Sequence, residues 1–320
     1  MEFLSKELYD QTCNYITDKI RKPEGEKPEF NAVLEHYAKI LENYVYTEAK
    51  KGKFKMFYQP KYEPNEKTTK SAESLFKMRN PAIERDDAFI NPEVAFHLLK
   101  QNGHEKDVVL KQLEIICKDM KNNDFVATEP NFKVSVNVAV DCLDRDFINK
   151  LKESLKENRL KANVIKIEIL ENEDFSKLNE KKPIFDELKS MGISFALDDF
   201  GSLNAKGEDV LNSLYYDEVK IDKSILDEAK ETGNYEELKK QYNMIKKALP
   251  NATVVMEGVD GIFNRELKTY TLKTEKVLEN LRKIGPMNYQ GFGFKKPMPA
   301  SELGELLREQ NGLSFGAMGE

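Results

Sequence analysis

Five short apolar runs of this chain end in acidic or amide side chains. The side chains are Glu73, Asn137, Glu168, Glu171, Asp198, Asp199 and Glu257. If the runs form parallel strands, their carboxyl ends bring these side chains together at one rim. Two unit charges about 4 Å apart repel by roughly 4 kcal/mol at an effective dielectric near 20, so converging acids must take up protons or bind cations. The pattern therefore predicts a metal site.

The donor types at this predicted site narrow the choice of metal. Carboxylate and amide oxygens suit hard cations such as Mg²⁺, Mn²⁺ or Ca²⁺. The histidines of the chain are His36, His97 and His104. None of them has ligand spacing with a cysteine, which disfavours zinc. Each acid taken alone could be a solvated strand end or a helix cap, but the adjacent pair Asp198 and Asp199 is harder to explain in that way.

The elements that must position these groups can be predicted from residue 53 onward, where short apolar runs alternate with longer helical patterns. Strands are predicted at residues 53–58, 71–77, 133–138, 164–170, 193–197, 218–221, 253–256 and 289–294. Helices are predicted at residues 108–120, 147–158, 178–191 and 235–249. Eight strands with intervening helices predict an α/β fold, a TIM-like (β/α)₈ barrel with a mainly parallel sheet and an N-terminal helical extension.

The N-terminal residues have a different pattern. Apolar residues at helical spacing predict one helix within residues 3–20 and a second within 30–49, separated by a Pro- and Glu-rich break. These helices could pack on the outside of the barrel, or they could form a signalling or dimerising pair. We expect a helical extension or linker at residues 1–50, a barrel domain at 51–310 and a flexible tail at 311–320.

Composition limits the class of protein. The chain has 320 residues, 40% of them hydrophobic, which is enough for a sizeable core. Its net charge of −6, with no run of basic residues, argues against binding to a DNA or RNA duplex. The cysteines Cys13, Cys117 and Cys142 are too scattered for a disulfide framework. With no signal-peptide pattern and no membrane-spanning apolar stretch, a reducing, cytoplasmic location is expected.

In chain order, the motifs resemble those of the EAL domain, the family of cyclic di-GMP phosphodiesterases. The segments concerned are Phe54-Lys-Met-Phe-Tyr-Gln-Pro60, Glu73-Ser-Leu75 with Pro81, Val136-Asn-Val-Ala139, Ile167-Glu-Ile-Leu-Glu171, Asp198-Asp-Phe-Gly201, Lys220-Ile-Asp222, Met256-Glu-Gly-Val-Asp260 and Gln290-Gly-Phe-Gly-Phe-Lys-Lys-Pro297. Together they span about 250 residues. Any one motif is weak evidence, and their common order carries the resemblance.

The resemblance implies hydrolysis of cyclic di-GMP to linear pGpG with two divalent cations, Mg²⁺ or Mn²⁺, and inhibition by Ca²⁺. By position, it implies the metal ligands Glu73, Asn137, Glu168, Asp198 and Asp199. It implies catalytic-site roles for Lys220, Glu257, Glu171 and Gln290, and substrate contacts from Gln59, Lys77 and Arg79. Within this assignment Lys220 and Glu257 position or deprotonate the attacking water, Gln290 orients the groups around the metal, and Glu171 anchors a loop. A homodimer is also expected from the resemblance.

The chain departs from the family pattern in several places. Lys77 stands where the family usually has arginine, and lysine lacks bidentate phosphate geometry. Arg79 could supply the missing arginine contact with the phosphate only if the strand register bends. The loop at 202–207 has an apparent extra residue, and the segment around 261–273 is longer than usual by about a dozen residues.

These departures leave an alternative open, in which a catalytically weak or inactive EAL domain binds cyclic di-GMP as a receptor or regulatory module. An interaction protein that binds no nucleotide, and a barrel hydrolase acting on another phosphodiester, are further alternatives.

Overall fold

The structure is a computed structural model of the 320-residue chain, and it describes residues 5–22, 24–83, 88–171, 175–202, 207–260, 263–264, 269–270 and 272–313. The chain divides into two compact units. The first, called here the helical unit, consists of Met1–Met56 and Phe76–Ile115. The second, called the barrel unit, consists of Phe57–Leu75 and Ile116–Glu320.

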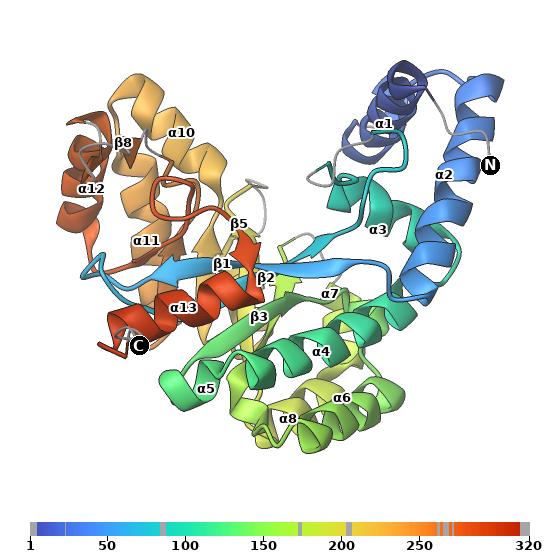
Figure 1. Cartoon of the computed structure of the whole chain (residues 1–320). Coiled ribbons are helices and arrows are strands. Elements are labelled where there is room, and N and C mark those ends of the chain that lie inside the picture. Colours follow the sequence, from blue (N-terminus) through green and yellow to red (C-terminus); the bar gives the residue numbers. More distant parts are fainter. Residues whose placement is uncertain are drawn as a thin grey trace, which may run out of the picture. The chain divides into compact units, whose positions relative to one another are not determined.

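Eight strands form a closed barrel (Figure 1). They are β1 (Lys55–Tyr62), β2 (Thr69–Lys77), β3 (Lys133–Asn137), β4 (Ile165–Leu170), β5 (Ser194–Phe200), β6 (Glu218–Ile221), β7 (Thr253–Met256) and β10 (Asn288–Tyr289). Neighbouring strands follow the chain order, and β10 closes the barrel by pairing with β1. A short strand, β11 (Met298–Pro299), pairs antiparallel with β1. The predicted (β/α)₈ barrel is confirmed.

In the barrel, β2 to β7 and β10 run parallel, but β1 is antiparallel to β10. Residues 63–68 join β1 to β2, and this connection is too short for a crossover helix. The backbone N–H of Glu63 donates to the carbonyl of Thr68 at 2.8 Å. Asn65 Oδ1 accepts from the N–H groups of Lys67 and Thr68 at 2.9 and 3.1 Å. This local turn explains why the first strand of an otherwise parallel barrel is reversed.

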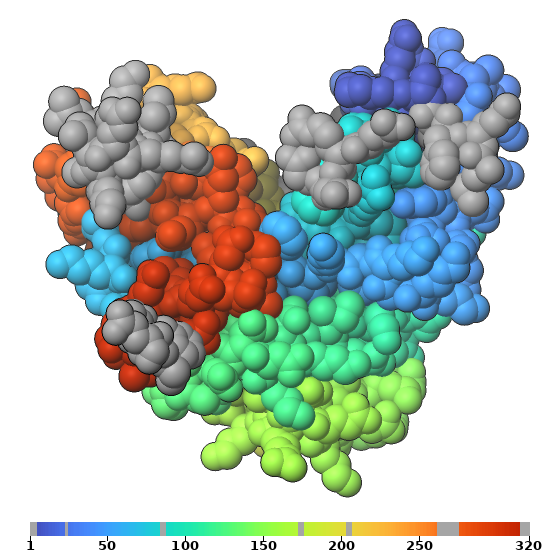
Figure 2. Space-filling view, in the orientation of Figure 1, coloured from blue at the N-terminus to red at the C-terminus, as the bar shows by residue number. Residues whose placement is uncertain are grey.

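Helices follow most strands of the barrel unit. Its helices are α5 (Phe125–Thr128), α6 (Arg145–Glu157), α7 (Phe175–Glu180), α8 (Lys182–Ser190), α9 (Gly207–Ser213), α10 (Lys223–Thr232), α11 (Glu236–Ala248), α12 (Leu272–Ile284) and α13 (Ala300–Gln310), with 3₁₀ turns η2 (Val140–Cys142) and η3 (Ala162–Val164). The predicted helices at 147–158 and 235–249 correspond to α6 and α11. Figure 2 shows α13, in red, on the surface of the molecule.

Several predicted elements have different bounds in the structure, among them the strands predicted at 53–58 and 193–197, which extend to Tyr62 and Phe200. The helix predicted at 178–191 is divided into α7 and α8 around Lys181, because Pro183 lacks an N–H group and favours the first turn of a new helix. The strand predicted at 289–294 ends at Tyr289. Beyond it the chain turns, with the N–H of Phe294 donating to the carbonyl of Gly291 at 3.1 Å. That part of the strand prediction was wrong.

The barrel interior contains charged side chains. Lys61 of β1 contacts Ser135 of β3, Glu168 of β4 and Glu218 of β6. None of β3, β4 and β6 neighbours β1 in the sheet, so Lys61 can reach their side chains only inside the closed barrel. Buried isoleucines alternate with the charged residues of β4, as expected for a strand whose outer face is covered by helices.

The helical unit contains α1 (Lys6–Arg21), the 3₁₀ turn η1 (Glu24–Glu26), α2 (Ala32–Lys50), α3 (Pro92–Gln101) and the first part of α4 (Glu105–Asn122). Helices α1, α2 and α3 pack on one another. Side-chain oxygens of Ser5 and Asn31 cap α1 and α2, a common role for these residue types at the start of a helix. Tyr15 Oη donates to Glu35 at 2.6 Å, which ties α1 to α2.

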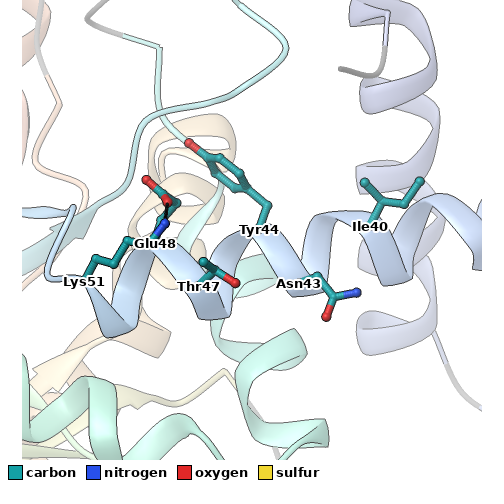
Figure 3. A pocket seen from close by; sticks show the side chains of 6 residues that line it. All are labelled: Ile40, Asn43, Tyr44, Thr47, Glu48 and Lys51. Atoms are coloured by element: carbon teal, nitrogen blue, oxygen red, sulfur yellow. Dashed lines mark hydrogen bonds and ion pairs between the residues drawn. The ribbon is translucent and has the colours of Figure 1, made fainter. Parts of the chain in front are cut away.

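A hollow of about 310 Å³ lies along α2 in the helical unit. Its lining residues are Ile40, Asn43, Tyr44, Thr47, Glu48 and Lys51 (Figure 3). Tyr44 Oη donates to the carbonyl of Arg79 at 3.3 Å. No helix in the described part of the chain combines the length and apolar character that a membrane span needs.

Several predictions fall partly outside the described residues. Residues 203–206 of the loop at 202–207 and residues 314–320 of the predicted tail lie outside them. Within the segment around 261–273, the structure describes a short antiparallel pair, β8 (Phe263–Asn264) and β9 (Thr269–Tyr270). The remaining residues of this segment before α12 lie outside the described residues. The boundaries of the extension, barrel domain and tail stay predictions, and so does a dimerising role for the N-terminal helices.

Candidate metal centre

The ammonium group of Lys220 lies among four carboxylates, which we call the acidic cluster. Its Nζ atom is 2.7 Å from Asp198 Oδ1, 2.8 Å from Glu257 Oε1, 3.0 Å from Glu73 Oε2 and 3.1 Å from Glu168 Oε2. Lys220 and Glu168 are each 1% exposed, so these charges are shielded from water. The acidic cluster is therefore a buried concentration of negative charge that already surrounds one cation.

Parallel strands bring these side chains together. Glu73 belongs to β2, Glu168 to β4, Asp198 to β5 and Lys220 to β6, and Glu257 directly follows β7. In the sheet register Asn137 is paired with Glu168, and Leu170 with Asp198. Because parallel strands end at the same rim of a barrel, side chains near their carboxyl ends converge there. The sequence could thus place these acids near one another before any contact was known.

Two amides hold Glu73 within the acidic cluster. Asn137 Nδ2 donates to Glu73 Oε1 at 2.9 Å, and Gln290 Nε2 donates to Glu73 Oε2 at 2.7 Å. Gln290 Nε2 also lies 3.3 Å from Gln59 Oε1, and Gln59 Nε2 donates to the carbonyl of Lys295 at 3.3 Å. Gln290 Oε1 is buried and has no hydrogen-bond partner among the described residues. This carbonyl oxygen is an acceptor that a ligand could use.

Asp198 and Asp199 lie at an irregularity of β5. The register with β6 shifts between Leu197 and Phe200, as at a β-bulge. Asp199 has a φ of 56°, a left-handed conformation that is uncommon for a residue other than glycine. Its N–H donates to Asp198 Oδ1 at 3.1 Å. Backbone conformations of this kind are often found at functional sites.

Glu171 contacts the segment that follows Asp199. Its Oε2 atom accepts from the N–H of Gly201 at 3.1 Å and from the hydroxyl of Ser202 at 3.3 Å. Gly201 has a φ of 90°, and a Cβ at this position would be 2.5 Å from Ile225 Cδ1. Glu171 therefore ties the end of β4 to the start of the 202–207 loop, the position expected for a loop anchor.

Burial and charge shift the pKa values of the acidic cluster in different directions. Burial raises the pKa of Asp198 to about 8 and that of Glu257 to about 7, although Lys220 opposes both shifts. Burial alone would raise the pKa of Glu168, but Lys220 and Lys61 outweigh it and hold that pKa well below its usual range. Burial alone would lower the pKa of Lys220, but the surrounding carboxylates raise it well above its usual value. Lys220 therefore stays charged.

The donor set of the acidic cluster fits hard divalent cations. One group of possible ligand atoms comes from Glu73, Glu168 and Asp198, and a second from Asp198, Asp199 and Glu257, with all atoms of a group within 4.8 Å of one another. All of these donors are carboxylate oxygens, which suit Mg²⁺ or Mn²⁺. Asp198 is common to both groups, so it could contribute to two neighbouring ions. The close approach of the Lys220 ammonium shows that this set of oxygens accommodates a cation.

Two residues assigned to the substrate belong to the helical unit. Lys77 ends β2, is half-buried, and has its Nζ atom 5.7 Å from the centre of the Phe89 ring. Burial lowers the pKa of Lys77. Arg79 is exposed and forms an isolated antiparallel bridge with Phe89. Met78, between Lys77 and Arg79, is fully buried, so the alternation of a strand continues through this segment.

Sequence reasoning missed three buried charged residues in the barrel interior. Lys61 Nζ lies 2.5 Å from Glu168 Oε1 and 2.6 Å from Glu218 Oε1, and Lys166 donates to the other oxygen of Glu218. One signal for them was present. Lys166 and Glu168 are two residues apart in an otherwise apolar strand, so both point to the same face.

Comparisons with known proteins bear on the family and the fold of the chain. The EAL domain family model matches residues 43–297. Signaling protein YkoW of Bacillus subtilis is 22% identical over 262 residues, which cover 81% of this chain and 30% of YkoW. Cyclic di-GMP phosphodiesterase NbdA of Pseudomonas aeruginosa is 23% identical over 254 residues, covering 79% of this chain and 30% of NbdA. The matched region is thus less than a third of the length of either relative.

A solved structure also has the same fold. The PaMucR phosphodiesterase, in a cyclic di-GMP complex, superposes with a TM-score of 0.68 at 21% sequence identity. The match covers 82% of this chain and 99% of that chain.

Proposed function

The chain belongs to the EAL domain family, and on that premise we propose that it is a metal-dependent phosphodiesterase that hydrolyses cyclic di-GMP to linear pGpG. The observation that carries the proposal is the acidic cluster around Lys220, to which four strands and the residue directly after β7 contribute. The names of NbdA and of the PaMucR complex support the choice of substrate. The proposal extends to a role in cyclic di-GMP signalling.

The residues have distinct roles in this proposal. Glu73, Asn137, Glu168, Asp198 and Asp199 hold the cations, two Mg²⁺ or Mn²⁺ ions. Bound divalent cations supply positive charge to the phosphate and lower the pKa of bound water.

The remaining residues of the site act directly on the water or on the geometry around it. Lys220, buried and charged, stabilises negative charge that develops during hydrolysis. Glu257 lies at the edge of the acidic cluster and is half-buried, which suits a group that accepts a proton from water. Gln290 orients Glu73 through its 2.7 Å hydrogen bond, and Glu171 fixes the loop after Gly201.

Substrate contacts from Gln59, Lys77 and Arg79 are part of the proposal on the family pattern alone. A homodimer is proposed on the same basis.

A receptor without turnover is the second candidate function. It is favoured by Lys77, which stands where the family usually has arginine and whose ammonium lies over the Phe89 ring. A lysine offers a point charge and lacks the planar fork with which arginine holds a phosphate. In this alternative the acidic cluster still binds cations and cyclic di-GMP, but the nucleotide leaves unchanged.

The test is incubation of the purified protein with cyclic di-GMP in Mg²⁺ or Mn²⁺, with a chelator control, followed by chromatography of the products. A parallel binding titration uses Ca²⁺, which is expected to inhibit hydrolysis. Metal-dependent appearance of pGpG supports the phosphodiesterase. Binding without product selects the receptor, and absence of both binding and product contradicts both candidates.

A further inference from the structure

A second buried charge network lies inside the barrel, next to the acidic cluster. It consists of Lys61, Lys166, Glu168 and Glu218. Lys61 is 0% exposed, and its Nζ atom contacts Glu168, Glu218 and the hydroxyl of Ser135 at 2.5, 2.6 and 3.0 Å. The two lysines and two glutamates balance in charge. This network reaches the acidic cluster through Glu168, which belongs to both.

The two oxygens of Glu168 have different partners. Oε1 lies 2.5 Å from Lys61 Nζ, and Oε2 lies 3.1 Å from Lys220 Nζ. Lys61 comes from β1 and Lys220 from β6, so the carboxylate is held between cations on different strands. A carboxylate with one oxygen fixed in this way cannot rotate freely about its terminal bond. Its second oxygen therefore stays directed at the acidic cluster.

Fold stability gives little reason for charges in this position. Desolvation of buried ions costs several kcal/mol per ion, and apolar side chains of similar volume often stabilise an interior as well or better. In TIM barrels this space is commonly filled by branched apolar residues. The contact with Glu168 supplies a reason for Lys61 that packing does not, because groups that orient metal ligands affect metal affinity strongly.

We propose that Lys61 is a positioning residue that holds Glu168 in the orientation in which it binds a divalent cation. Lys61 acts through Glu168 Oε1 and does not itself touch the cation or the substrate. The inference rests on the proposed function for the identity of the site as a metal centre. It adds a residue from β1 that lies outside the ligand and catalytic set assigned above.

Two charge-balanced double variants separate positioning from stability. Lys61→Met/Glu218→Gln removes the contact with Glu168 Oε1 and leaves Lys166 and Glu168 as one positive and one negative charge. Lys166→Met/Glu218→Gln removes the same number of charges but keeps Lys61 beside Glu168. Each pair replaces one lysine by methionine and one carboxylate by an amide of the same shape. Any general effect of losing buried charges is therefore shared by both variants.

The measurement is Mn²⁺ affinity in the absence of nucleotide, from the electron paramagnetic resonance signal of free Mn²⁺, together with thermal unfolding in a chelator. We expect Lys61→Met/Glu218→Gln to bind Mn²⁺ about 10- to 100-fold more weakly than wild type, the range typical for loss of a group that orients a ligand. Lys166→Met/Glu218→Gln should stay within about threefold of wild type. Equal Mn²⁺ affinities of the two variants would overturn the proposal.

Two further outcomes are distinguishable. If Lys61→Met/Glu218→Gln does not fold, Lys61→Gln/Glu218→Gln takes its place, since a polar amide fills the site but is too short to keep the 2.5 Å contact. The same loss of affinity is expected, and its absence contradicts the proposal.

Wild type that binds Mn²⁺ without hydrolysing cyclic di-GMP contradicts the phosphodiesterase but leaves the role of Lys61 measurable. Wild type that does not bind Mn²⁺ contradicts both.

Discussion

Replacing Lys220 by methionine tests whether the acidic cluster depends on an internal cation when no metal is bound. Removing one partner of a buried ion pair costs about 3–5 kcal/mol, because the other charge stays buried and unpaired. In this site four carboxylates lose their shared contact. Burial already raises the pKa of Asp198 to about 8 and that of Glu257 to about 7, so protons can relieve part of the repulsion near neutral pH. We therefore expect a loss near the lower limit, about 3 kcal/mol.

Denaturant unfolding at neutral pH, with a chelator or with excess Mn²⁺, measures this loss. In the chelator, Lys220→Met should unfold at lower denaturant than wild type by an amount that corresponds to about 3 kcal/mol. Excess Mn²⁺ should narrow the difference, because the cation takes the place of the missing ammonium and therefore stabilises Lys220→Met more than wild type. A ligand at 100 times its Kd stabilises a folded state by about 2.7 kcal/mol, which sets the scale of the effect. The expected rescue reflects replacement of the missing positive charge by the metal.

A matched control is Lys133→Met. Lys133 is half-buried, and its Nζ atom donates to the hydroxyl of Ser194 at 2.5 Å, not to a carboxylate. Its loss should cost no more than about 1.5 kcal/mol, and Mn²⁺ should stabilise Lys133→Met by as much as it stabilises wild type, because this variant keeps the metal site intact. Lys220→Met that is as stable as wild type in the chelator would refute the reasoning. So would equal Mn²⁺ responses in the two variants.

Three other predictions address the site and the two units separately. Glu73→Ala should abolish turnover of cyclic di-GMP by removing a metal ligand, and unchanged hydrolysis in a chromatographic assay would contradict the site assignment. Gly291→Ala should destabilise the protein by about 1–3 kcal/mol, because its Cβ would lie 2.5 Å from the backbone of Val259; an unchanged unfolding midpoint would argue against this close packing. Arg21→Ala should lower the free energy of unfolding by no more than about 1 kcal/mol, since the ion pair of Arg21 with Glu93 is exposed to solvent. A larger loss in the same unfolding assay would contradict this expectation.

The barrel could be predicted from the sequence because its strands and helices have clear local patterns. The alternation of apolar runs with helical spacing located all eight strands. The first and fifth strands extend further than predicted, to Tyr62 and Phe200, and the last ends earlier, at Tyr289. The reversal of β1 depends on the short turn at 63–68. This connection is too short to hold the crossover helix that a parallel pair of strands needs, although the strand pattern alone predicts a mainly parallel sheet. Pro183 explains the break between α7 and α8. The prediction joined the two helices because apolar residues have helical spacing on both sides of the proline.

The sequence by itself determined which groups reach the rim of the barrel, because a residue at the end of a parallel strand is placed there by the strand that carries it. The acids near the ends of β4 and β5 and directly after β7 follow from this rule, whereas Glu73 lies in the middle of β2. Only the tertiary structure decided which atoms meet. The contacts of Lys220 with four carboxylates, and of Lys61 with Glu168, join residues up to 147 positions apart across a closed barrel. Such pairings depend on strand register and barrel closure, which no local pattern encodes, and they set the charge balance of the site.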